Sequence, residues 1–123
     1  LDSFQLPKTN NNLIVEGAGG LLVPINEDGH YLSDVIVKLG MEVILVSKNY
    51  LGSINHTLLS IAYLKSKSIS IIGIIIIGDK NESSESIITK NTGVNVLHHV
   101  PMAESVTREF IKVQAELLRF ALN

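Results

Sequence analysis

The sequence contains no cysteine among its 123 residues. That absence excludes a disulfide framework, a thiolate metal site and a cysteine nucleophile. Aromatic residues are also scarce, at 5% of the chain, whereas aliphatic residues dominate. This balance favours an α/β protein with buried parallel strands over an all-β sandwich. The length suits one domain with a modest hydrophobic core.

A strong charge of one sign and a long apolar run are missing too. The formal net charge is −2, which predicts neither a nucleic-acid-binding surface nor a basic membrane-binding patch. The most apolar stretch, residues 69–77, is interrupted by Ser70 and Gly73 and is far too short to cross a bilayer. The sequence opens with Leu1 instead of methionine, so we expect a piece of a longer protein. A cysteine-free chain is compatible with the cytoplasm, where we expect this one.

Short segments rich in Val, Ile and Leu predict four buried strands, at residues 12–16, 42–47, 71–77 and 94–100, and a small further strand at 21–23. Apolar residues at helical spacing predict helices between and after them, at residues 32–39, 54–62, 83–91 and 106–120. Gly40 and Gly93 follow two of these helices as natural stops. The alternation favours βαβ units. We therefore predict a single α/β domain over residues 1–123, with a parallel sheet covered by helices on both faces.

A carboxylate and a glycine-rich turn follow the first predicted strand directly. Residues 15–24 read Val-Glu-Gly-Ala-Gly-Gly-Leu-Leu-Val-Pro. Ligands of open α/β sheets bind beyond the carboxyl ends of strands, where glycines let backbone N–H groups approach an anion. A carboxylate such as Glu16 suits magnesium, which takes oxygen ligands. The pattern predicts an anion and magnesium site, although a plain tight turn beside a solvent-facing glutamate fits it equally well.

Three motifs together resemble the dethiobiotin synthetase family. Val-Glu-Gly-Ala-Gly-Gly, with Val-Pro close behind, is similar to the family's signature, and Leu-Gly-Ser-Ile-Asn-His at residues 51–56 is similar to its later Leu-Gly-(small)-Ile-Asn-His motif. Val100-Pro101 stands where the family has Ile-Pro. The motifs occur in the family's order and at similar spacing, and they span most of the chain. The first two together are fairly specific.

The resemblance implies the carboxy-terminal half of a P-loop NTPase-like enzyme that uses ATP and Mg²⁺ and forms a homodimer. One amine of 7,8-diaminopelargonate takes up CO2 as a carbamate in this family. ATP phosphorylates the carbamate, and the second amine attacks its carbon, which closes the ureido ring and releases phosphate. The protein's task is then mainly positioning and charge neutralisation around the γ-phosphoryl group.

The same resemblance gives roles to residues of the first motif. Glu16 matches the family's magnesium-binding carboxylate. Gly17, Ala18 and Gly19 match the turn that lies along the nucleotide phosphates.

Residues of the second motif receive a role in substrate binding. Gly52, Ser53 and Asn55 match a loop and helix start that meets the substrate's carboxylate tail across the dimer interface. A helix start offers N–H donors and a positive dipole end to a carboxylate. Without the resemblance, the favoured explanation is that Ser53 is a simple N-cap and Asn55 a solvated residue of the first turn.

The sequence departs from the family in two ways. It has no Gly-x-x-x-x-Gly-Lys-Ser/Thr loop, nor the family's substrate-contacting lysine and second magnesium ligand, so we expect no catalytic residue here and no turnover by this chain alone. The family also reads adenine with an Asn after the third strand, where this chain has Ile77. We expect backbone groups around Gly78 and of Pro101, Met102 and Ala103 to bind the base, or else the base to be held loosely.

Other polar residues carry weaker signals. His98 and His99 are neighbours in a predicted strand, so their side chains should point to opposite faces and not share a metal ion. Glu82 and Glu85 suit the positive end of a helix dipole. His30 and His56 stand alone in the sequence, and we expect them to be surface or hydrogen-bonded residues.

Two other functions stay open. One is a non-catalytic binding or dimerisation module of the same fold. The other is an amide-forming ligase of cobalamin synthesis, against which the Gly-Gly-x-x-Val-Pro and Gly-Ser-Ile-Asn-His stretches argue. A Gly-Lys-Thr loop encoded upstream of Leu1 would favour the enzyme.

Overall fold

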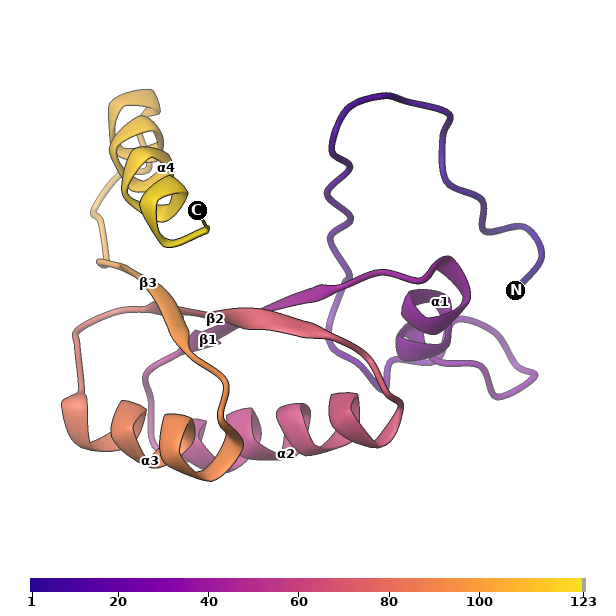
Figure 1. The fold of residues 1–123 in the computed structure, drawn as a ribbon, viewed down its shortest axis with the longest axis horizontal. Coiled ribbons are helices and arrows are strands. Elements are labelled where there is room, and N and C mark those ends of the chain that lie inside the picture. The colour runs from indigo at the N-terminus through magenta and orange to yellow at the C-terminus, as the bar shows by residue number, and fades with distance from the viewer. Residues whose placement is uncertain (123) are drawn as a thin grey trace.

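The computed structural model describes residues 1–122, which form four helices and three strands (Figure 1). In chain order these are α1 (Leu32–Leu39), β1 (Val43–Lys48), α2 (Ser53–Ser66), β2 (Ile71–Ile77), α3 (Glu82–Thr92), β3 (Val96–Val100) and α4 (Arg108–Leu122). The strands pair in the order β1-β2-β3, and both pairings are parallel. The predicted alternation of strands and helices and the parallel sheet are therefore confirmed.

Helices lie on both faces of the sheet. Figure 1 shows α2 and α3 side by side beneath it, while α4 lies above β3 on the opposite face. The core fills the lower layer, where Ile61, Ile74, Ile76, Ile88 and Val94 are nearly inaccessible to solvent. Each fully buried side chain of this kind contributes about 1.5–3 kcal/mol. This lower layer, rather than α4, which buries no residue fully, supplies most of the hydrophobic stabilisation.

Two of the predicted strands do not form. Residues 12–16 pair with no strand among residues 1–122, and Ile14 and Val15 are 92% and 53% exposed. An apolar segment becomes a strand only when a neighbour accepts its backbone hydrogen bonds. Residues 21–23 form no strand either, because the Val23 N–H turns back to the Gly20 carbonyl at 3.2 Å. The first prediction was wrong because a pairing partner is lacking. Residues 21–23 instead form a turn, and the Leu21 and Val23 carbonyls accept from the Ser33 and Leu32 N–H groups at the start of α1.

Helix ends follow their capping residues. The Asp34 carboxylate accepts a hydrogen bond from the Tyr31 N–H at 2.8 Å where α1 begins. Asn81 caps α3 by accepting from the Ser84 N–H at 3.1 Å. The glycines that follow α1 and α3, at positions 40 and 93, take the left-handed conformation, as predicted for helix stops. Among residues 1–122, no helix combines the length and apolar character that a membrane span requires.

The strand pairings contain irregularities that place side chains. Between Ile74 and Ile75 the register with β3 shifts, so that Leu97 is an extra residue on β3. Its side chain lies over Gly73, where an added Cβ would stand 2.5 Å from Leu97 Cγ. A glycine at this position makes room for the bulge, as is common where a strand is irregular.

Candidate functional site

The carboxyl ends of the three parallel strands lie at one edge of the sheet, and hydrogen bonds join the segments that leave them. The Asn49 N–H donates to the Ile77 carbonyl at 3.2 Å, and the Gly78 N–H donates to the Val100 carbonyl at 2.9 Å. The Asn49 side-chain amide also donates to the Asp79 carbonyl at 2.6 Å. The loop after β2 is therefore fixed from both sides, and this is the edge where open α/β sheets bind ligands.

The predicted base-binding residues lie at this edge. Gly78 has a φ of +108°, and nothing lies within 4 Å of the position that a Cβ would take there. Pro101, Met102 and Ala103 follow β3 directly, and Met102 is 62% exposed. The backbone hydrogen bond between Gly78 and Val100 brings the two predicted segments together.

Glu85 also belongs to this edge, although the sequence indicated only a helix-dipole role for it. Its carboxylate is buried, with the residue 9% exposed. Oε1 accepts from the Asn81 N–H at 2.8 Å, and Oε2 lies 3.1 Å from Nε2 of His99. Burying a carboxylate is costly unless its oxygens are hydrogen-bonded. Glu85 meets that condition by joining the start of α3 to β3.

The two adjacent histidines point to opposite faces, as predicted. His98 Nε2 lies 2.8 Å from Oε1 of Gln114 on α4, whereas His99 faces Glu85 on α3. Over residues 1–122, no three His, Asp or Glu side chains are grouped so that they would hold a metal ion.

The glycine-rich turn lies in another place, beside α1 and β1. A groove of about 500 Å³ has Val15, Gly17 and Gly19 on one side and residues of α1 and β1 on the other. Leu32 leaves no room for a side chain at Gly17, and Gly19 has a φ of +90°. The turn itself therefore favours glycine at both positions, for lack of space at Gly17 and for the backbone conformation at Gly19. The adjoining Glu16 is exposed, and the groove includes none of the residues predicted to bind the base.

The second predicted group is brought together by the start of α2. Gly52, Ser53 and Asn55 line one cavity of about 530 Å³, together with Leu51 and residues of α2 and α3. The N-cap is Gly52, at a φ of +100°, and not Ser53, which is the first helical residue and is 8% exposed. The prediction of a Ser53 cap was wrong, because the left-handed turn at Gly52 shifts the helix start by one residue.

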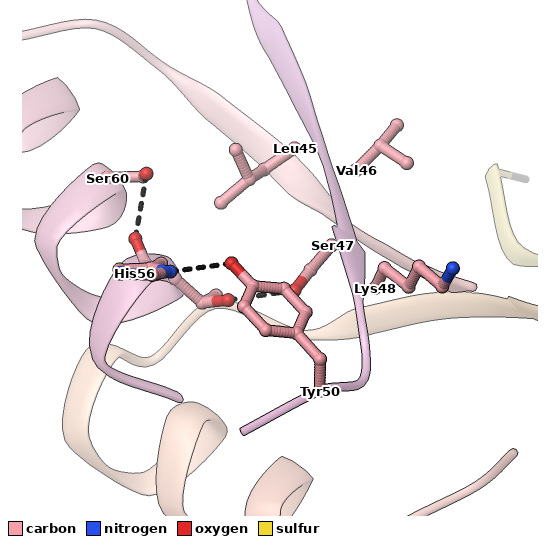
Figure 2. A pocket seen from close by; sticks show the side chains of 8 residues that line it. Leu45, Val46, Ser47, Lys48, Tyr50, His56 and Ser60 are labelled. Carbon is pink, nitrogen blue, oxygen red and sulfur yellow. Dashed lines mark hydrogen bonds between the residues drawn. The ribbon is translucent and has the colours of Figure 1, made fainter. Parts of the chain in front are cut away.

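A hydroxyl-rich cavity of about 190 Å³ lies between β1 and α2. Figure 2 shows the Tyr50 hydroxyl turned toward His56, with Oη 2.5 Å from Nδ1. Ser47 and Thr57 join their hydroxyls at 2.8 Å, and Ser60 donates to the His56 carbonyl. His56 is exposed and hydrogen-bonded, as predicted. It holds Tyr50 back against α2 and so shapes the turn that contains Gly52.

Comparison with known proteins identifies the family. A family model described as an AAA domain matches residues 1–110. The chain belongs to this AAA domain family. It is 52% identical over 116 residues to the ATP-dependent dethiobiotin synthetase of Cytophaga hutchinsonii, a match that covers 94% of this chain and 56% of that protein. It is 43% identical over 119 residues to the corresponding synthetase of Christiangramia forsetii, which covers 97% and 56% of the two chains.

A third relative, from Lawsonia intracellularis, is an ATP-dependent dethiobiotin synthetase with 40% identity over 112 residues, covering 91% of this chain and 54% of its own. The chain thus spans about half the length of the curated relatives it matches. These matches confirm the predicted resemblance to dethiobiotin synthetases and the predicted P-loop NTPase-like fold class.

Proposed function

We propose that the complete protein is an ATP- and Mg²⁺-dependent dethiobiotin synthetase, acting as a cytoplasmic homodimer. It would close the ureido ring of dethiobiotin from 7,8-diaminopelargonate and CO2. The observation that carries the proposal is the 52% identity, over 94% of this chain, with the synthetase of Cytophaga hutchinsonii. The chain matches 56% of that relative's length, so it would supply one part of the active site and the remaining part of the protein would supply the other.

The edge formed by the ends of β2 and β3 would hold the nucleotide base. The Ile77 side chain offers no hydrogen bond, so contacts to the base would come from the backbone near Gly78 and of Pro101, Met102 and Ala103. The hydrogen bond from Gly78 to the residue before Pro101 supports this role, because it fixes both segments at the ligand-binding edge of the sheet.

Glu16 would supply one ligand to Mg²⁺, and the turn of Gly17, Ala18 and Gly19 would lie along the ATP phosphates. Mg²⁺ typically keeps waters and phosphate oxygens and takes only one or two protein carboxylates. An exposed carboxylate outside any three-ligand cluster in residues 1–122 fits that pattern. The ion would neutralise charge on the phosphates during transfer.

The cavity at the start of α2 would receive the carboxylate tail of 7,8-diaminopelargonate. The first N–H groups of a helix lack intrahelical partners and lie at its positive end. Gly52, Ser53 and Asn55 all line this cavity, which supports the role. Leu51, also in the lining, is fully exposed, and a second copy of the chain would cover it.

In the reaction, these residues would hold the substrate while an oxygen of its carbamate attacks the γ-phosphorus and ADP leaves. The second amine then attacks the carbamate carbon, and the phosphorylated oxygen leaves as phosphate. Positioning of the two substrates is the main contribution that this part of the protein would make.

The test is dethiobiotin formation by the complete protein from 7,8-diaminopelargonate, bicarbonate, ATP and Mg²⁺. We expect Glu16→Gln to lower kcat at least about a hundredfold, and Glu27→Gln, which removes the same charge from another exposed position, to leave it unchanged. A wild-type protein that forms no dethiobiotin would favour the non-catalytic module. Full activity of Glu16→Gln would remove Glu16 from the magnesium site.

A further inference from the structure

We propose that Glu85 is a positioning residue for ATP, because it fixes the loop after β2 against the end of β3. The inference rests on the proposed function, in which these two segments hold the nucleotide base. Glu85 lies on α3 beneath the sheet and would act through the backbone that it holds rather than by touching the nucleotide.

The burial of Glu85 sets it apart from an ordinary acidic residue of a first helical turn. Glu82 stands in the same turn, with a side chain 83% exposed and 3.2 Å from the Lys80 ammonium. The Glu85 side chain is 11% exposed. A favourable interaction with the helix dipole needs no burial, so the dipole alone does not explain why Glu85 points inward.

Each carboxylate oxygen of Glu85 binds a different segment. Oε1 accepts the Asn81 N–H at 2.8 Å, at the end of the loop that starts with Gly78. Oε2 lies 3.1 Å from His99 Nε2, two residues before Pro101. His99 Nδ1 is buried and has no hydrogen-bond partner among the described residues. The tautomer with the proton on Nε2 donates to Glu85 and leaves only a lone pair unpaired at Nδ1.

The link through Glu85 is the second connection between these segments. The first is the backbone hydrogen bond from the Gly78 N–H to the Val100 carbonyl. Asn49 also holds this loop from the side of β1, and Glu85 adds a separate connection that holds it to β3. Residues that hold a binding segment in this way improve affinity by pre-organisation, without a contact of their own.

If Glu85 positions the base, the expected result differs from that for a residue that only stabilises the fold. Loss of Glu85 should weaken the binding of ATP, which carries a base, and leave unchanged the binding of inorganic tripolyphosphate, which does not. A residue that merely supports the fold would change both affinities or neither. Glu82→Ala is the matched control, because it removes an exposed carboxylate from the same helical turn.

The experiment uses the complete protein with Glu85→Ala, Glu85→Gln and the control. We expect Glu85→Ala to raise KM for ATP about tenfold, as loss of one buried charged link predicts, with kcat and the inhibition constant of tripolyphosphate changed less than about twofold. Glu85→Gln keeps an acceptor for the Asn81 N–H and should fall between wild type and Glu85→Ala. If Glu85→Ala does not fold, His99→Leu removes the other end of the link, and KM for ATP should again rise.

An unchanged KM for ATP in the folded variants, or a parallel rise in the tripolyphosphate inhibition constant, would overturn the role of Glu85. Dethiobiotin formation by the wild type tests the proposed function separately. If the wild type forms none, calorimetric Kd values for ATP and tripolyphosphate replace the kinetic constants and the same comparison holds. A wild type that binds no ATP overturns both proposals.

Discussion

Replacing Gly73 with alanine tests whether the bulge in β3 dictates the residue at position 73. The added Cβ would stand 2.5 Å from Leu97 Cγ and 2.8 Å from each of its methyl groups. Because the branch carbon itself is too close, rotation of a methyl group does not relieve the clash. Gly73 is buried in β2, so Leu97 or the strand itself must shift.

Two opposing effects set the magnitude. Alanine reduces the conformational entropy of the unfolded chain, which favours folding by about 0.4–1 kcal/mol where the backbone permits it. Gly73 is not among the glycines with positive φ, so the backbone does permit alanine. Overpacking a filled site costs about 1–3 kcal/mol. The clash should therefore prevail, with a net loss of about 0.5–2 kcal/mol in the free energy of unfolding.

Urea unfolding of the purified protein, followed by circular dichroism, measures this loss as a lower midpoint. The same substitution in a Leu97→Ala background should be neutral or stabilising, because the obstructing branch is gone. The difference between the two backgrounds is the coupling free energy of the pair. Equal destabilisation in both backgrounds, or a higher midpoint for Gly73→Ala in the wild type, would refute the steric argument.

Three shorter predictions concern acid stability, the core and assembly. The hydrogen bond from the Tyr31 N–H holds the pKa of Asp34 below its ordinary value. This carboxylate therefore stabilises the fold above a pH of about 3.9, and the stabilisation is lost as the pH falls further. When the free energy of unfolding is measured against pH, Asp34→Asn should lack that part of the pH dependence. Ile74→Ala, at a fully buried position, should cost about 2–5 kcal/mol in urea unfolding, whereas Ile14→Ala, at a position 92% exposed, should stay within about 0.5 kcal/mol. Leu51→Glu should make the complete protein monomeric in light scattering and weaken its affinity for diaminopelargonate; an unchanged dimer would place the interface elsewhere.

Elements with a complete local pattern could be predicted from the sequence. The helix at residues 32–39, with its glycine stop, and the strand at 71–77 form with the predicted bounds. The last strand begins at Val96 instead of residue 94. Val94 is buried, but its N–H donates to the Thr92 hydroxyl at 3.1 Å rather than to a neighbouring strand. A hydrophobic pattern indicates which residues are buried, and Val94 is buried although it lies before the first residue of the strand.

The side-chain contacts of the candidate site were harder to predict, because they depend on which faces of the helices and strands pack against each other. The link between Glu85 and His99 joins residues 14 positions apart in the sequence, and it requires the His99 face of β3 to lie over α3. The contact between Tyr50 and His56 spans the turn in which Gly52 takes its left-handed conformation. The sequence motifs identified the segments of the candidate site, whereas the partners of their side chains required the structure.

Residues 12–16 lack a pairing partner, and one edge of the sheet lacks a neighbouring strand. Strand β1 has no neighbour on its outer side among residues 1–122, and its Val46 is 58% exposed. The groove of about 500 Å³ separates this open edge from Val15. An unpaired apolar edge favours association with another strand. This chain matches 56% of the length of its relative from Cytophaga hutchinsonii, and under the proposed function a strand from the rest of a complete synthetase would occupy that place. A strand in the groove would cover β1, give residues 12–16 a neighbour to pair with, and set the position of Glu16 relative to Gly78.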